Sequence, residues 1–160
     1  MKKFQMMVLA VVLGALTAAS VASAVAVKKV AFSGSYAGQA TTKVDGNVAT
    51  IAAKGTGKGT IGAGTLTGNG TGDTSQQPCV PFGGTGKITG SAGTSIAFKV
   101  ISGGKGCGDE GGHTFSVSGY VSVVKATGKL AKAKGTLKFT GVYDRDDGSF
   151  NVKFTGTLTK

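Results

Sequence analysis

The residues best suited to chemistry gather in one short segment of the chain, residues 107–113. His113 is the only histidine, and Asp109 and Glu110 lie just before it. Imidazole and carboxylate groups are usual metal ligands and usual acid–base catalysts. A polar loop beside a cysteine uses the same residue types, and no G-x-S-x-G nucleophile motif occurs in the sequence. We therefore predict a protein that is not an enzyme and that has no metal or cofactor, with an enzyme working from this loop as the third hypothesis.

The N-terminal residues resemble an export signal. Lys2 and Lys3 precede an apolar run over residues 6–16, and the small residues that follow end in Ala22-Ser23-Ala24, which has the A-x-A form of a cleavage site. The apolar run is shorter than the roughly 20 residues that span a bilayer. We predict a signal peptide over 1–24, a single domain over 25–160 with no membrane span after cleavage, and a secreted product, extracellular or periplasmic.

The two cysteines, Cys79 and Cys107, are predicted to form a disulfide, because an even pair in an exported chain is usually oxidised. In the chain-entropy model, closing a loop of this length stabilises the fold by roughly 3 to 4 kcal/mol. The cysteines fall in the two longest stretches without strand patterning, 69–83 and 102–112. The bond is therefore expected to pin two loops together.

Four lysines form the best candidate for a binding surface: Lys132, Lys134, Lys138 and Lys153. The first three share the outward-facing positions of a strand predicted over 132–143, and Lys153 faces outward on its hairpin partner. Such a face attracts polyanions. Most phenylalanines have inward parity, so the exposed aromatic platform that single-stranded nucleic acids need is not expected.

The charge balance supports this surface. Without Lys2 and Lys3, 16 of the 18 basic residues remain against 7 acidic ones, a net charge of +9. The leading hypothesis is a non-enzymatic exported protein that associates with an anionic polysaccharide or another cell-envelope polymer through its lysines. The alternative is that these lysines only keep the exterior soluble and protect strand edges.

The elements that must position these residues are β-strands, because polar and apolar residues alternate with a period of two. The predicted strands span 30–44, 47–54, 59–68, 84–91, 94–101, 113–124, 132–143 and 150–159. Asp45-Gly46-Asn47 separates the first two, and Asp147-Gly148 closes a hairpin between Phe139 and Phe154. A sheet with one solvent-exposed face and one buried face is predicted to form an antiparallel barrel of about eight strands, with a two-sheet sandwich as the alternative.

The segment 127–135 reads TGKLAKAKG. It resembles the T-G-[KR]-[FYL]-A-x-A-x-G segment of allene oxide cyclase and dirigent-type barrel proteins, and of exported bacterial proteins built in the same way. The hairpin over 135–158, with its Asp-rich turn, is similar to the closing hairpin of those chains. The resemblance implies an eight-stranded antiparallel barrel, often oligomeric, with a central cavity. It transfers no activity, because no catalytic residue of those families matches a position here.

A barrel of this size can hold one small guest, and inward-facing glycines leave room for it. The second hypothesis is therefore a protein that binds a small apolar ligand inside its barrel. The sequence leaves open whether chains associate into oligomers.

Overall fold

The computed structural model describes residues 27–160, so the predicted signal peptide and its cleavage site lie outside the described residues. The described chain forms nine strands and one short 3-10 helix, η1 (Gly128–Leu130). The strands are β1 (Lys29–Asp45), β2 (Val48–Gly59), β3 (Gly62–Asp73), β4 (Cys79–Thr89), β5 (Ser95–Val100), β6 (Lys105–Gly108), β7 (Thr114–Ala126), β8 (Thr136–Asp144) and β9 (Ser149–Thr159). No helix within residues 27–160 is long and apolar enough to cross a bilayer.

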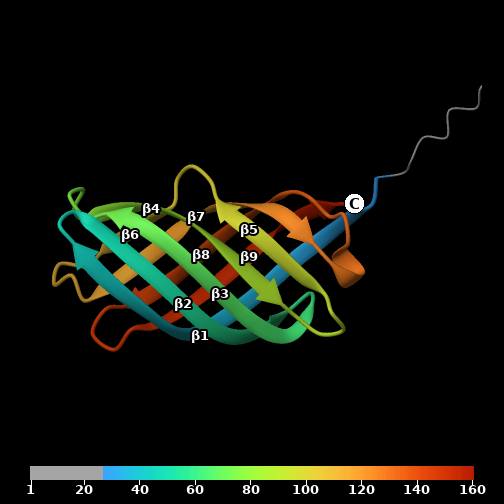
Figure 1. The fold of residues 1–160 in the computed structure, drawn as a ribbon, viewed down its shortest axis with the longest axis horizontal. Helices are drawn as coiled ribbons and strands as arrows, with labels where there is room; N and C mark the ends of the chain where they lie inside the picture. Colours follow the sequence, from blue (N-terminus) through green and yellow to red (C-terminus); the bar gives the residue numbers. More distant parts are fainter. Residues whose placement is uncertain (1–26) are drawn as a thin grey trace, which may run out of the picture.

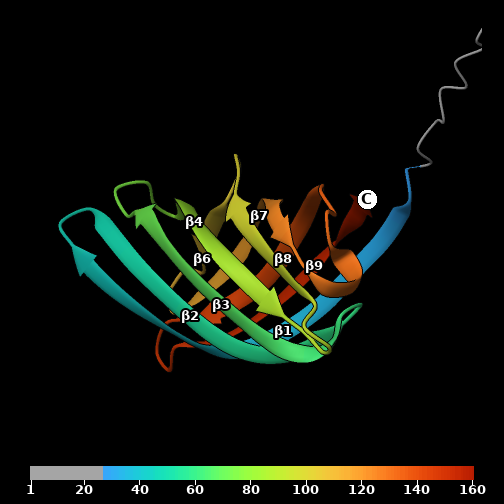
Figure 2. The same ribbon diagram turned by 45° about the vertical axis from the view of Figure 1, so that its right-hand side comes forward.

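The strands form one closed antiparallel sheet (Figures 1 and 2). β1 pairs with β9, and this pairing joins the first strand to the last. Strands β5 and β6 share one place, because both lie between β4 and β7. The barrel therefore has eight strand positions, one of which holds an interrupted strand. The predicted eight-stranded barrel is confirmed, and the closed sheet excludes the two-sheet sandwich.

The alternation of residue types explains how each strand faces the interior. On β1, Phe32, Tyr36 and Ala40 are buried, while the residues between them are mostly exposed. The hairpin of β8 and β9 pairs Phe139 with Phe154, as the sequence predicts. Each strand thus presents apolar side chains inward and polar side chains to solvent.

The two halves of the barrel interior are filled differently. In the half where β1 begins and β9 ends, large aliphatic side chains pack without exposure, among them Ile88, Ile96, Leu137 and Leu158. In the other half, alanines and glycines occupy most inward positions of β2 and β3. We call these two halves the closed end and the mouth. In Figure 1 the closed end is on the right, next to the C-terminus, and the mouth is on the left.

The TGKLAKAKG segment plugs the closed end. The Thr127 hydroxyl donates to the carbonyl oxygen of Gly93 at 2.8 Å and accepts the backbone N–H of Ser95 at 3.0 Å. Gly128 has a φ of +60°, and a Cβ at this position would collide with Thr94. After this tight turn, Leu130 points into the core and is only 3% exposed. The segment therefore ties the β4–β5 loop to the end of the barrel.

Two local predictions are wrong. The stretches 69–83 and 102–112 are not irregular, since the first contains the end of β3 and the start of β4 and the second contains β6. Cys79 and Cys107 form a disulfide, but they are directly paired residues of β4 and β6 and do not join loops. Hydrophobic patterning misses these strands because glycine occupies most of their inward positions.

Candidate functional site

The mouth half of the barrel contains a cavity of about 440 Å³. Its deep wall is apolar and buried, and consists of Leu66, Phe98, Val121, Phe139, Val152 and Phe154. Arg145 is the only charged residue in the lining, and it is exposed near the mouth. Small-molecule sites typically have 300 to 1,000 Å³ of mainly apolar space with a few polar groups. This cavity has the size and chemistry of such a site.

Small residues create the cavity. Ala53 of β2 and Gly68 of β3 are direct partners, and both line it. A Cβ on Gly68 would meet only the carbonyl oxygen of Thr85, at 3.6 Å, so the space beside it is open. Gly84 of β4 has a different role, because a Cβ there would collide with the carbonyl oxygen of Asn69. Glycine at position 68 thus leaves space that no side chain fills, and glycine at position 84 lets β3 and β4 approach closely.

Hydroxyl groups stand around the mouth of the cavity, and the hydroxyl of Tyr36 is buried in the barrel core with no hydrogen-bond partner among the described residues. The hydroxyls of Thr42 on β1 and Tyr143 on β8 are 3.0 Å apart, a hydrogen bond between residues 101 positions apart in sequence. The Tyr143 ring also stacks at a tilt on Phe115, with 6.3 Å between ring centroids. A ligand that enters the cavity therefore passes a rim of hydroxyl groups before it meets apolar side chains.

The mouth is acidic. Every acidic residue of the chain lies on the strand ends and loops that surround it: Asp45, Asp73, Asp109, Glu110, Asp144, Asp146 and Asp147. Lys43, Lys105 and Arg145 are the basic residues near the same strand ends and loops, so acidic residues outnumber basic ones there. The rim is therefore a region of negative potential on a protein whose net charge is positive.

Within the predicted 107–113 segment, Cys107 and Gly108 end β6, and the loop over 109–113 is held by hydrogen bonds to backbone N–H groups. The carboxylate of Asp109 accepts the N–H groups of His113 and Thr114, at 2.9 and 3.3 Å. The His113 ring contacts Asp146 of the β8–β9 turn, with 2.8 Å between Nδ1 and Oδ2, and both side chains are mostly exposed. Glu110 is exposed and makes no hydrogen bond or ion pair within the described part of the chain. No three His, Cys, Asp or Glu side chains of residues 27–160 are grouped to hold a metal ion.

The hydrogen bond and charge of Asp146 raise the pKa of His113 above its usual value of about 6.5. Below about pH 6.5, protonated His113 therefore stabilises the contact between the two loops. This stabilisation is lost as the pH rises through the raised pKa of His113. We expect Asp146→Asn to return the His113 pKa toward 6.5. NMR titration of the single imidazole measures this pKa. Asp45→Asn, in another turn, serves as the control and should leave the titration unchanged. Equal midpoints in the wild type and Asp146→Asn would contradict the assignment.

The four candidate lysines do not form one strand face. Strand β8 begins at Thr136, so Lys132 and Lys134 lie in the connection between η1 and β8 at the closed end. Lys132 has a φ of +66°, which lies in the left-handed region and outside the range of regular β-strands. Lys138 and Lys153 do face outward, on the paired strands β8 and β9. All four are exposed, but the common strand predicted for the first three is wrong.

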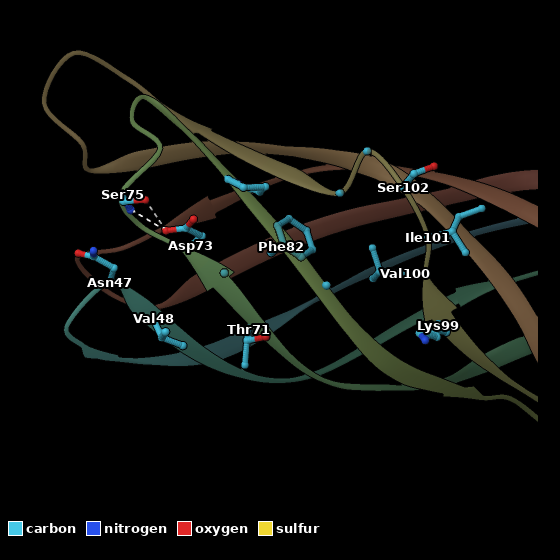
Figure 3. A pocket seen from close by; sticks show the side chains of 15 residues that line it. Asn47, Val48, Thr71, Asp73, Ser75, Phe82, Lys99, Val100, Ile101 and Ser102 are labelled. Atoms are coloured by element: carbon cyan, nitrogen blue, oxygen red, sulfur yellow. Dashed lines mark hydrogen bonds between the residues drawn. The ribbon is translucent and has the colours of Figure 1, made fainter.

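A second depression, of about 1060 Å³, lies on the outer face of the barrel near the mouth (Figure 3). Val48 and Thr71 line one side, and Ile101 and Ser102 the other. At its edge the Asp73 carboxylate accepts the hydroxyl and the N–H of Ser75, at 2.6 and 3.0 Å. Most of its lining residues face outward, so a guest there would keep much of its surface in water. The internal cavity offers far more burial and is the better candidate site.

No model of a protein family matches the chain, and no curated protein matches its sequence. The assignment of a function therefore depends on the chain's own geometry.

Proposed function

We propose that this protein is a non-enzymatic carrier that holds a small apolar molecule in the mouth half of its barrel. The observation that carries the proposal is the apolar cavity of about 440 Å³, with the aromatic rings of Phe98, Phe139 and Phe154 along its deep wall. Burying apolar ligand surface contributes about 25 cal/mol per Å². The cavity offers that burial without requiring the barrel to open.

The charge around the mouth favours a neutral ligand over an anionic one. The deep wall contains no cation to pair with an acid group, and the exposed Arg145 is surrounded by the carboxylates of its own turn. A carboxylate or sulfonate at the rim would meet like charges, and one deep inside would be desolvated without a partner. A neutral molecule avoids both costs.

The test is fluorescence titration with two probes that differ only in charge. N-phenylnaphthylamine is neutral, and anilinonaphthalene sulfonate is the same skeleton with an added anionic group. We expect saturable one-to-one binding of the neutral probe with a Kd on the order of 10 μM, or about −7 kcal/mol. The anionic probe should bind in the cavity at least tenfold more weakly. Added salt should reduce this difference in Kd between the two probes, because it screens the negative charge of the acidic rim.

The two parts of the proposal fail separately. If the neutral probe shows no saturable binding, the cavity is not a ligand site. If the sulfonated probe competes with the neutral probe at equal or higher affinity, the preference for an uncharged ligand is wrong.

A further inference from the structure

Charge is divided between the two ends of the barrel. The seven acidic side chains surround the mouth, and the closed end has none: the β2–β3 turn, the β4–β5 loop and the 127–135 connection all lack Asp and Glu. Aspartate is favoured in turns wherever they lie, so turn preference alone does not place every acid at one end. The division is a separate property of the surface.

The closed end carries nine exposed lysines: Lys28, Lys29, Lys58, Lys125, Lys129, Lys132, Lys134, Lys138 and Lys160. Several are direct neighbours. Lys28 and Lys160 exchange backbone hydrogen bonds of 2.9 Å, and the Lys160 ammonium donates to the carbonyl oxygen of Lys129 at 2.7 Å. The only ion pair among residues 27–160 joins His113 and Asp146 at the opposite end. The cluster of lysines is therefore not neutralised by acidic side chains.

Exposed aliphatic side chains lie among these lysines. Val27, just before β1, is 68% exposed, and Val124 is 64% exposed. Val124 protrudes because the pairing of β5 with β7 skips it, as Ala97 pairs with Lys125 and Phe98 with Val123. Lysines that surround isolated apolar side chains are typical of surfaces that bind anionic lipid headgroups.

We propose that the closed end docks on a bilayer rich in anionic phospholipids and that the mouth faces away from it. The acidic mouth is repelled by the same surface, so the two ends orient the barrel in the same sense. This docking does not depend on the cavity, and either proposal stands if the other fails.

The experiment uses the 25–160 chain, which contains every described strand and the whole described core. Its binding to phosphatidylglycerol–phosphatidylcholine vesicles is measured by co-sedimentation at low ionic strength. The test variant is Lys129→Glu/Lys132→Glu/Lys134→Glu, at the closed end. The matched control is Lys54→Glu/Lys99→Glu/Lys153→Glu, which makes the same charge change at exposed strand positions outside the closed-end cluster. Circular dichroism of both variants verifies that the β-structure is retained.

We expect the closed-end variant to bind at least 100-fold more weakly than the wild type and the control variant to stay within about threefold. Vesicles of phosphatidylcholine alone should bind none of the three proteins. Equal losses in both variants would show an effect of net charge and overturn the docking surface. Equal binding to neutral vesicles would overturn the role of the lysines. A preference for soluble alginate over anionic vesicles, lost in the closed-end variant, would overturn the bilayer as partner and identify an acidic polymer in its place.

Discussion

Replacing Gly68 with leucine is expected to weaken binding of N-phenylnaphthylamine by about 30-fold and to leave the barrel at least as stable. Gly68 faces the cavity, and its backbone lies outside the left-handed region, so a side chain enters the open space without strain. The new side chain excludes two or three methylene equivalents of the ligand, each contributing about 0.8 kcal/mol. The loss is then about 2 kcal/mol, which corresponds to the expected change in Kd. The double variant Ala53→Leu/Gly68→Leu should abolish binding.

The control for this experiment is Thr67→Leu, one position earlier on β3. Thr67 is exposed on the outer face, so the same side chain is added without filling the cavity. Probe affinity should remain within twofold of the wild type. Urea denaturation distinguishes a filled cavity from a damaged fold, because Gly68→Leu should not lower the unfolding midpoint. Unchanged affinity in the Ala53→Leu/Gly68→Leu variant would contradict the location of the site.

The fold could be predicted where a strand has apolar residues on one face and polar residues on the other. On β1, Phe32 and Tyr36 alternate with Ser33 and Ser35, so the period of two is visible in the sequence. Strand β6, with the sequence KGCG, has no large apolar side chain and was not predicted. The second half of β3 was missed for the same reason, because Gly70 and Gly72 contribute no hydrophobic signal. These strands are held mainly by pairing with neighbours, which one sequence does not reveal.

The site was harder to predict than the fold, because the cavity exists largely where glycines provide no side chain to fill the interior. Gly68 and Gly70 line the cavity, but in the sequence such glycines are indistinguishable from those of a loop. The partners around the mouth also come from distant segments, as with Thr42 and Tyr143. Charge was visible as a total, whereas its division between the two ends requires the barrel topology. Two sequence signals pointed toward a cavity: the inward glycines of the predicted strands and the resemblance of segment 127–135 to barrel proteins.

Removing the disulfide is expected to lower the free energy of unfolding by about 3 to 4 kcal/mol, the largest stability change we predict. The variant is Cys79→Ser/Cys107→Ser, and the bond it removes closes a loop between residues 28 positions apart. Without it, β6 retains three residue pairs with β4 and four with β7. So short a strand depends strongly on a covalent tie, since little apolar burial holds it.

Urea denaturation of this variant under oxidising conditions measures the change directly, and the reduced wild type provides the matched control. Both proteins should lose the same free energy of unfolding, because both lack the covalent constraint on the unfolded chain. Hydrogen exchange should also become faster in β6 than in β8, since β8 pairs along most of its length with both of its neighbours. Gly106 of β6 lines the cavity, so loosening this strand should also weaken the binding of the neutral probe by a few-fold. A loss below about 1 kcal/mol would contradict this account of how β6 is held.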